Sequence, residues 1–94
     1  MKVRFTAVAR REIAEILSYI AHDNPVAARK VAFEIETTVA LLSRHPRIAI
    51  VVHESGARAK LVGRFQYRIF YTIDDDTLTV RNVRSTRRRL PWDI

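Results

Sequence analysis

The first third of the chain changes from a strand-like pattern to a helical one. Residues 2–6, Lys-Val-Arg-Phe-Thr, alternate polar and apolar side chains, which is typical of a short, half-buried strand. Thr6 is a favourable cap for a helix that begins at residue 7. The apolar positions that follow share one helical face: Ala9, Ile13, Ile16, Leu17 and Ile20. The charged residues of this helix are expected on its exposed surface: Arg10, Arg11, Glu12 and Glu15.

Asn24-Pro25 marks the boundary between this helix and a second one. Asn is a strong N-cap, and proline at the first helical position gives up no hydrogen bond that it would have made. Pro46 prevents the second helix from continuing, so we expect it to end near Ser43 or Arg44. Its buried stripe is predicted to be Ala28, Val31, Ile35, Val39 and Leu42. So short a connection predicts an antiparallel helical hairpin.

After Pro46 the pattern changes to the two-residue period of β-strands. Residues 48–52 are a short apolar run, and residues 58–62 follow a turn at residues 54–56, Glu-Ser-Gly. The clearest strand spans residues 66–73, and one face of it carries Tyr67, Ile69, Tyr71 and Ile73.

The last two strands are predicted to form a hairpin. Asp74-Asp75-Asp76 makes a polar turn, and residues 78–84 return as the partner strand. Val83 breaks the strict alternation of that strand, so we predict a β-bulge near Arg81-Asn82.

These elements predict an α+β fold in a single domain, residues 1–94. The helical hairpin, residues 7–44, is expected to pack on one face of a small antiparallel sheet, residues 48–85. A basic tail without a periodic pattern, residues 86–94, completes the chain.

Composition narrows the class of protein. The chain has 94 residues, of which 48% are hydrophobic, so it is long enough for one core. It contains no cysteine, which excludes disulfides, thiol catalysis and cysteine-based zinc sites. No apolar run approaches the roughly 18 residues of a membrane-spanning helix, and no signal peptide is recognisable, so we expect a cytoplasmic protein.

The positive charge is concentrated in the second half. The formal net charge is +7, and residues 56–94 carry nine basic against four acidic residues, a net of +5. Guanidinium groups suit both phosphate and carboxylate, so the charge favours a polyanion or an acidic protein as the partner.

The remaining candidate groups indicate no metal or cofactor. His22, His45 and His53 match no metal-binding spacing and are interpreted as exposed or capping residues. The three aspartates at residues 74–76 lie at a hairpin tip, where a solvated turn is favoured over a metal site. Two glycines in the whole chain exclude a phosphate-binding loop of the P-loop type.

The basic residues of the sheet half are the main candidates for function. If the helices cover one face of the sheet, several of these side chains converge on the open face, where they would hold phosphates. The alternative is a solvated basic face that keeps the protein soluble. The residues are Arg58, Lys60, Arg64, Arg68, Arg81, Arg84, Arg87, Arg88 and Arg89.

The aromatic residues leave two interpretations open. Tyr67 and Tyr71 share a face with apolar residues, which favours packing in the core over stacking on bases. Trp92 either docks on the core or presents its ring to a partner.

The sequence resembles the RelE/ParE superfamily of type II toxin–antitoxin toxins, and its ParE-like branch in particular. The specific combination is Tyr-Ile-x-x-Asp-Asn-Pro-x-Ala-Ala at residues 19–28 with Tyr-Arg-Ile-x-Tyr at residues 67–71. Leu41-Leu42 before Pro46 and the basic tail add to it, so the resemblance spans nearly the whole chain.

The resemblance implies a cytoplasmic bacterial toxin in a hetero-oligomeric complex with a cognate, acidic, partly disordered, ParD-like antitoxin. ParE-like members poison DNA gyrase, and we take this as the expected activity, without chemistry by the chain itself. RelE-like members are ribosome-dependent mRNA endoribonucleases, which gives the alternative of a metal-independent enzyme. A third possibility is a non-toxic homologue that only binds the antitoxin.

One position departs from the family pattern. Family members commonly carry a histidine after the last strand, and Ser85 stands at that position here. Serine has too high a pKa to act as a general acid or base unaided, so this departure argues against RNA cleavage. It has little bearing on gyrase binding, which needs no proton transfer.

Three sets of residues follow from the resemblance. The expected target-binding residues are Arg58, Arg64, Arg68, Arg81, Arg84, Arg87 and Trp92. The expected antitoxin-binding residues are Ile13, Ile16, Leu17, Ile20, Arg58 and Tyr67. If the chain is a ribonuclease, the residues that hold the scissile phosphate are Lys60, Arg64, Arg81 and Arg87.

Overall fold

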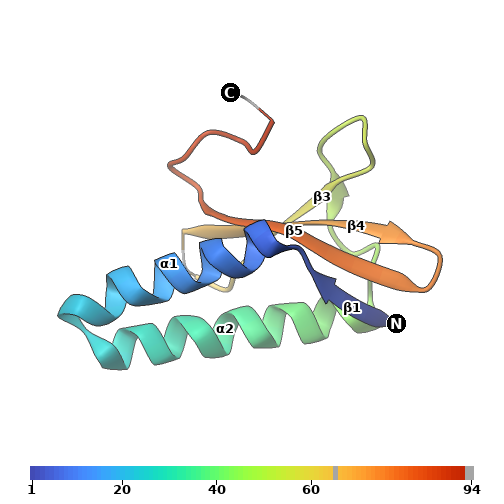
Figure 1. Cartoon of the computed structure of the whole chain (residues 1–94). Coiled ribbons are helices and arrows are strands. Elements are labelled where there is room, and N and C mark those ends of the chain that lie inside the picture. Colours follow the sequence, from blue (N-terminus) through green and yellow to red (C-terminus); the bar gives the residue numbers. More distant parts are fainter. Residues whose placement is uncertain (65, 93–94) are drawn as a thin grey trace.

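Two helices lie against one face of a five-stranded sheet in the computed structural model, which describes residues 1–64 and 66–92 (Figure 1). In chain order the elements are β1 (Lys2–Phe5), α1 (Ala7–Asp23), α2 (Pro25–Arg44), β2 (Ile50–Val51), β3 (Arg58–Leu61), β4 (Tyr67–Asp74) and β5 (Thr77–Ser85). The predicted α+β fold is confirmed. The last two residues of the predicted basic tail lie outside the described residues. Within the described part, neither helix combines the length and the apolar character needed to cross a membrane.

The helical hairpin is built by the caps that the sequence predicted. The Thr6 hydroxyl oxygen accepts a hydrogen bond from the backbone N–H of Ala9 at 3.0 Å, which satisfies a free donor at the start of α1. Asn24 ends α1 and begins α2, because its N–H donates to Ile20 while its side chain accepts from Ala27 at 3.0 Å. Pro25 occupies the first turn of α2, where its missing N–H costs nothing.

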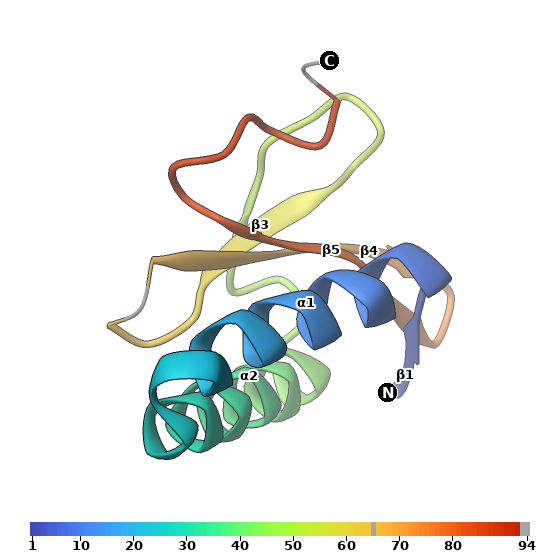
Figure 2. The ribbon, with the colours of Figure 1, turned by 60° about the vertical axis from the view of Figure 1, so that its left-hand side comes forward.

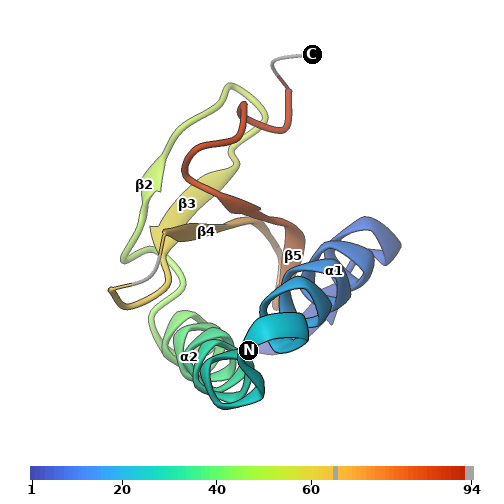
Figure 3. The ribbon, with the colours of Figure 1, turned by 90° about the vertical axis from the view of Figure 1, so that its left-hand side faces the viewer.

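The second helix supplies most of the helical part of the core. Its predicted stripe is confirmed, since all five residues are less than 10% exposed. Seen along the helices, α2 lies below the sheet and α1 lies beside β5 (Figure 3). The stripe meets the buried faces of the two long strands, and the apolar residues involved include Leu42, Ile69, Tyr71, Leu78 and Val80.

The order of strands in the sheet is β1-β5-β4-β3-β2. All neighbouring pairs are antiparallel except β1 and β5, which run parallel with Lys2 opposite Thr77. The antiparallel pairs agree with the sheet that the sequence predicted. The parallel pairing of β1 with β5 was not predicted. The predicted hairpin turn is confirmed, although Asp74 ends β4 and only Asp75 and Asp76 form the turn, with Asp75 in the left-handed region at φ 52°.

The predicted β-bulge is confirmed at Arg81. Phe70 lies opposite Asn82, but the next residue, Tyr71, lies opposite Val80, so Arg81 is the extra residue in β5. The bulge returns Val83 to the helix-facing side, where it is 1% exposed.

The first strand after the helices is shorter than the apolar run at residues 48–52. Only Ile50 and Val51 form β2, and they are 73% and 52% exposed. Because β2 is an edge strand that pairs only with β3, most of this apolar run stays outside the core.

Tyr71 ties the sheet to the end of the helical hairpin. Its side chain is fully buried, and its hydroxyl donates to the carbonyl oxygen of Pro46 at 2.7 Å. Burial raises the pKa of the Tyr71 phenol above its ordinary value, although a backbone hydrogen bond from Ala49 and the charge of Arg58 act in the opposite direction.

Truncating Leu42 tests the packing of α2 on the sheet. Leu42 is fully buried, so Leu42→Ala should lower the free energy of unfolding by about 2–5 kcal/mol through lost burial and a residual cavity. Val26 on the same helix is 53% exposed, and Val26→Ala should have a much smaller effect. Urea denaturation of both variants measures the difference, and equal effects would show that the helix is placed wrongly.

Replacing Tyr71 tests its buried hydroxyl. Tyr71→Phe should cost about 0.5–1.5 kcal/mol at neutral pH, because the hydrogen bond to Pro46 is lost. The pKa of Tyr71 is higher in the folded state than its ordinary value of 10.0, so above pH 10.0 the unfolded chain ionises more readily than the folded one. The free energy of unfolding of the wild type should therefore fall as the pH rises above 10.0. Part of that fall should be absent in Tyr71→Phe. Tyr19→Phe is the control, since Tyr19 is 81% exposed and should leave the pH dependence unchanged.

Candidate functional site

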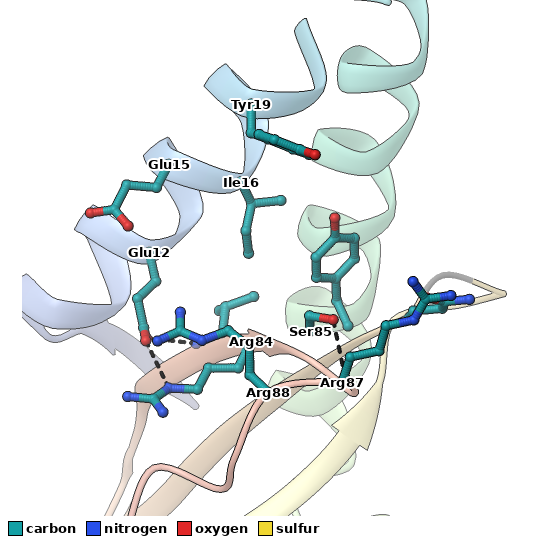
Figure 4. Close-up of a pocket in the computed structure, with 11 residues that line it drawn as sticks. Glu12, Glu15, Ile16, Tyr19, Arg84, Ser85, Arg87 and Arg88 are labelled. Atoms are coloured by element: carbon teal, nitrogen blue, oxygen red, sulfur yellow. Dashed lines mark hydrogen bonds and ion pairs between the residues drawn. The ribbon is translucent and has the colours of Figure 1, made fainter. Parts of the chain in front are cut away.

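A pocket of about 490 Å³ opens between α1 and the adjoining ends of β4 and β5 (Figure 4). The two strand ends adjoin because Tyr67, the first residue of β4, lies opposite Ser85, the last residue of β5. The pocket is lined from α1 by Glu12, Glu15, Ile16 and Tyr19. From the sheet and the segment after it come Gln66, Tyr67, Val83, Arg84, Ser85, Arg87 and Arg88.

The pocket forms where β5 loses its strand partner. β1 ends at Phe5, opposite Val80, and α1 then runs along the free edge of β5. Thr6 makes the first contacts in place of the missing strand. Its N–H donates to the carbonyl of Val80 at 3.0 Å, and its hydroxyl donates to the carbonyl of Arg81 at 2.9 Å. Further along α1, a carboxylate oxygen of Glu12 accepts from the N–H of Val83 at 3.1 Å. Thr6, the N-cap of α1, and the Glu12 side chain thus satisfy backbone groups that a strand would otherwise pair.

The Glu12 carboxylate is the centre of a buried polar cluster. It accepts from the side chains of Asn82 at 3.2 Å and Arg84 at 2.9 Å, besides the backbone of Val83. The Glu12 side chain is 8% exposed and the Arg84 side chain 15%. The prediction that Glu12 lies on the surface of α1 was therefore wrong. Three donors, one of them charged, compensate the loss of water around this carboxylate.

A signal for this burial exists in the sequence. Glu12 lies three residues after Ala9 and four before Ile16, so it shares the apolar stripe of α1. The position of Glu12 on that stripe indicates burial, whereas its charge alone indicates exposure. The acceptor role itself depends on β5, which is about 70 residues away in the chain.

Two exposed guanidinium groups of the pocket have no ion-pair partner among the described residues. Glu12 is paired with Arg84, and Glu15 is paired with Arg11 at 3.8 Å on the exposed side of α1. The described residues of the pocket lining form no ion pair besides these two. The exposed side chains of Arg87 and Arg88 therefore have no described carboxylate within 4.0 Å. The Ser85 hydroxyl oxygen accepts from the N–H of Arg87 at 3.2 Å and holds the turn that follows β5.

The apolar part of the pocket lies beside this basic rim. Ile16 and Tyr67 are half-buried, and Val83 forms the floor between them and the core. Figure 4 shows Ile16 directed into the space between α1 and the strands, with Tyr19 further along the helix. The pocket therefore offers apolar surface next to two guanidinium groups.

The basic residues of the sheet divide between its two faces, so the predicted placement on the open face was wrong for Arg58 and Lys60, whereas Arg68 and Arg81 do lie there. Arg58 and Lys60 lie opposite Tyr71 and Ile69, so the register places them on the helix-facing side. Arg58 also has a structural contact, since it donates to the carbonyl of Ala49 at 2.6 Å and braces the connection between α2 and β2.

The other expected target-binding residues lie in three places. Arg68 and Arg81 lie on the face away from the helices, where Arg81 donates to the Thr72 hydroxyl at 2.9 Å. Arg84 and Arg87 line the pocket, and Arg64 is exposed in the connection between β3 and β4. The set expected for RNA cleavage is thus spread over several elements: Lys60 in β3, Arg64 in the connection between β3 and β4, Arg81 in β5 and Arg87 after β5.

Trp92 docks on the sheet, as one of the two interpretations of its position predicted, and remains half-exposed. Its ring centroid lies 4.4 Å from that of His53 and 5.6 Å from that of Phe70, the latter edge to face. The tail thereby crosses the face opposite the helices (Figure 2). Arg84 contacts the same tail by donating to the carbonyl of Arg89 at 3.3 Å.

The expected antitoxin-binding residues divide between two hollows. Ile16 and Tyr67 line the pocket described above. Ile13 and Leu17 line a separate groove of about 350 Å³ between β1, α1 and α2, whose lining is mostly apolar and includes Val3 and Phe5. The rest of the set lies apart from the pocket: Ile20, half-buried against the core, and Arg58 in β3.

Comparison with known proteins agrees with this architecture. A family model described as the ParE toxin of the type II toxin–antitoxin system parDE matches residues 3–90. A chain of the chromosomal ParDE system from P. aeruginosa superposes with a TM-score of 0.79 at 15% identity, covering 90% of this chain and 95% of that chain. No curated protein sequence matches.

A second group of solved structures shares the fold at lower similarity. A chain of the heterotetrameric YoeB-YefM toxin-antitoxin complex from Staphylococcus aureus gives a TM-score of 0.60 at 15% identity, covering 87% of this chain and 92% of that chain. A chain of another YoeB-YefM complex from the same organism gives a TM-score of 0.58 at 14% identity, covering 89% of this chain and 94% of that chain.

Removing the Glu12 carboxylate tests the polar cluster. Glu12→Ala leaves the Arg84 guanidinium and the Val83 N–H without their acceptor, so it should lower the free energy of unfolding by about 3–5 kcal/mol. The control is Glu15→Ala, which breaks an exposed pair and should cost less than about 1 kcal/mol. Thermal and urea denaturation compare the two variants. A Glu12→Ala protein as stable as Glu15→Ala would contradict the buried cluster.

Proposed function

Because this chain belongs to the ParE toxin family of type II toxin–antitoxin systems, we propose that it arrests growth by binding DNA gyrase. We propose further that a cognate, acidic antitoxin neutralises it. The observation that carries the proposal is the pocket at the end of β5, with two free guanidinium groups and no histidine in its described lining.

The residues of the pocket support binding more than catalysis. Ser85 stands where a histidine is common in the family, and its hydroxyl oxygen accepts from the backbone of Arg87. All three histidines lie elsewhere: His22 beside Asp23, His45 at the end of α2, and His53 against Trp92. A general base for RNA cleavage needs to reach the proton that it removes, and no histidine in the described residues is close enough to Ser85 to share this pocket.

Cleavage of mRNA at the ribosome remains the alternative, with weaker support. Of the four residues expected to hold a scissile phosphate, Lys60 lies on the helix-facing side of the sheet, Arg81 lies on the opposite face, and Arg64 and Arg87 lie outside the strands. Stabilising a phosphodiester transition state requires several such groups around one phosphate.

An acidic partner fits the charge of the chain. The formal net charge is +7, and Arg87 and Arg88 place part of it at an accessible pocket. The structural neighbours are chains of toxin–antitoxin complexes, which supports an antitoxin as the natural partner. A partner that binds only the folded state would also add stability to so small a domain.

A supercoiling assay tests the gyrase proposal. The purified chain, freed from its antitoxin, should block supercoiling of relaxed plasmid by gyrase and cause cleaved DNA to accumulate. Arg87→Glu should weaken the inhibition by about tenfold or more, because it reverses a charge at the pocket rim, whereas Arg29→Glu, at an exposed position of α2, should not. Unaffected gyrase in the presence of the folded chain would contradict the proposal, and toe-printing for mRNA cleavage would then test the ribosome.

A further inference from the structure

The parallel pairing of β1 with β5 widens the sheet face that lies away from the helices. Arg4 in β1 lies opposite Thr79 in β5, and Thr79 lies opposite Thr72 in β4. Their neighbours Val80 and Tyr71 belong to the buried core on the helix-facing side, so these three residues project from the other face. They form one row across three adjacent strands, with about 10 Å between the backbones of the outer two strands.

Arg81 reaches this row from its place in the β-bulge. Its Nε donates to the hydroxyl oxygen of Thr72 at 2.9 Å, so its guanidinium group lies at the β4 end of the row. The backbone of the bulge is held as well, because the carbonyl of Arg81 accepts from the Thr6 hydroxyl at 2.9 Å. Arg4, at the β1 end, is exposed, as is Arg81. The row thus combines two guanidinium groups with two threonine hydroxyls.

The charge of this row is positive. None of the ion pairs found among the described residues includes Arg4 or Arg81. The next row toward the hairpin turn contains an acidic residue, Asp74, but it also contains Lys2, on the other side of Thr77. The row of Arg4 therefore favours an anionic ligand, and the acidic turn limits where that ligand can lie.

The docked tail limits the row on its other side. Phe70 projects from the same face as Thr72 but is 3% exposed, and Trp92 packs on it edge to face (Figure 2). His53 lies against Trp92, so the described aromatic rings on this face pack on one another. The row itself contains no aromatic side chain. It therefore offers charge and hydroxyl groups without the stacking surface that single-stranded nucleic acids use.

We propose that Arg4 and Arg81, with the hydroxyls of Thr72 and Thr79, bind the phosphate backbone of duplex DNA. Guanidinium and hydroxyl groups are common donors to backbone phosphates, and such contacts do not depend on the base sequence. This binding does not rest on the proposed function, because the row lies apart from the pocket of Figure 4. Together with that function, it lets the chain hold the DNA on which gyrase acts as well as gyrase itself.

The anisotropy of a short fluorescein-labelled DNA duplex of arbitrary sequence measures this binding. Arg4→Gln/Arg81→Gln should bind the duplex about tenfold or more weakly than the wild type, because two phosphate contacts are lost. The matched control is Arg29→Gln/Lys30→Gln, which removes the same charge from two exposed residues of α2 and should stay within about twofold of the wild type. Unchanged melting temperatures establish that both variants are folded. A folded row variant that binds the duplex as tightly as the control would overturn the proposal.

The salt dependence gives a second measurement on the same proteins. The logarithm of the binding constant falls with the logarithm of the salt concentration, by a slope of about 0.9 for each phosphate contacted. The slope for Arg4→Gln/Arg81→Gln should be smaller than that of the control by about two such contacts. Equal slopes would show that Arg4 and Arg81 contact no phosphate.

A single strand of the same sequence tests the choice of duplex DNA. It should bind the wild type more weakly than the duplex does, because its charge density is lower and the row gives its bases nothing to stack on. Tighter binding of the single strand, lost in Arg4→Gln/Arg81→Gln, would overturn the assignment to duplex DNA.

The outcomes also separate this proposal from the proposed function. If the wild type leaves gyrase unaffected while only the row variant loses affinity for the duplex, the gyrase target is wrong and the DNA site stands. If the wild type inhibits gyrase while the row variant binds the duplex as the control does, the target is supported and the DNA site is overturned.

Discussion

The arrangement at the functional end of this molecule depends on one carboxylate, that of Glu12. β1 covers the edge of β5 only as far as Val80, and beyond that point a backbone donor of β5 faces α1. Glu12 accepts from this donor and from the side chains on either side of it. Arg84 also lies opposite Arg68 across the β4–β5 ladder, and two like charges in such positions repel each other. The pairing with Glu12 offsets this repulsion.

The ion pair between Glu12 and Arg84 matters more for the positions of the elements that it joins than for the net stability of the fold. A buried ion pair adds little net stability over an apolar pair of the same shape, but it requires its partners to keep one geometry. Here it joins the first half of α1 to the end of β5, and the pocket lies between these two elements. The same contact pairs the Arg84 charge inside the protein, so within the described lining of the pocket the exposed positive charge is that of Arg87 and Arg88.

Features that depend on local chemistry were predictable from the sequence. Thr6, Asn24 and Pro25 set the helix ends through hydrogen bonds within a few residues, and the break in alternation at Val83 indicated the bulge. Features that depend on residues far away in the chain were not predictable from the sequence. The face on which Arg58 and Lys60 lie is set by the register of β3 against β4, and the burial of Glu12 is set by donors on β5. The docking of Trp92 likewise depends on His53 and Phe70, which no local pattern connects to the tail.

The proposal that the basic rim of the pocket binds DNA gyrase is tested most directly by the binding of the purified chain to immobilised gyrase. We expect Arg87→Glu to bind about tenfold or more weakly than the wild type, whereas Arg29→Glu, at an exposed position of α2, should bind as the wild type does. A folded Arg87→Glu chain that binds gyrase with wild-type affinity would contradict the proposal.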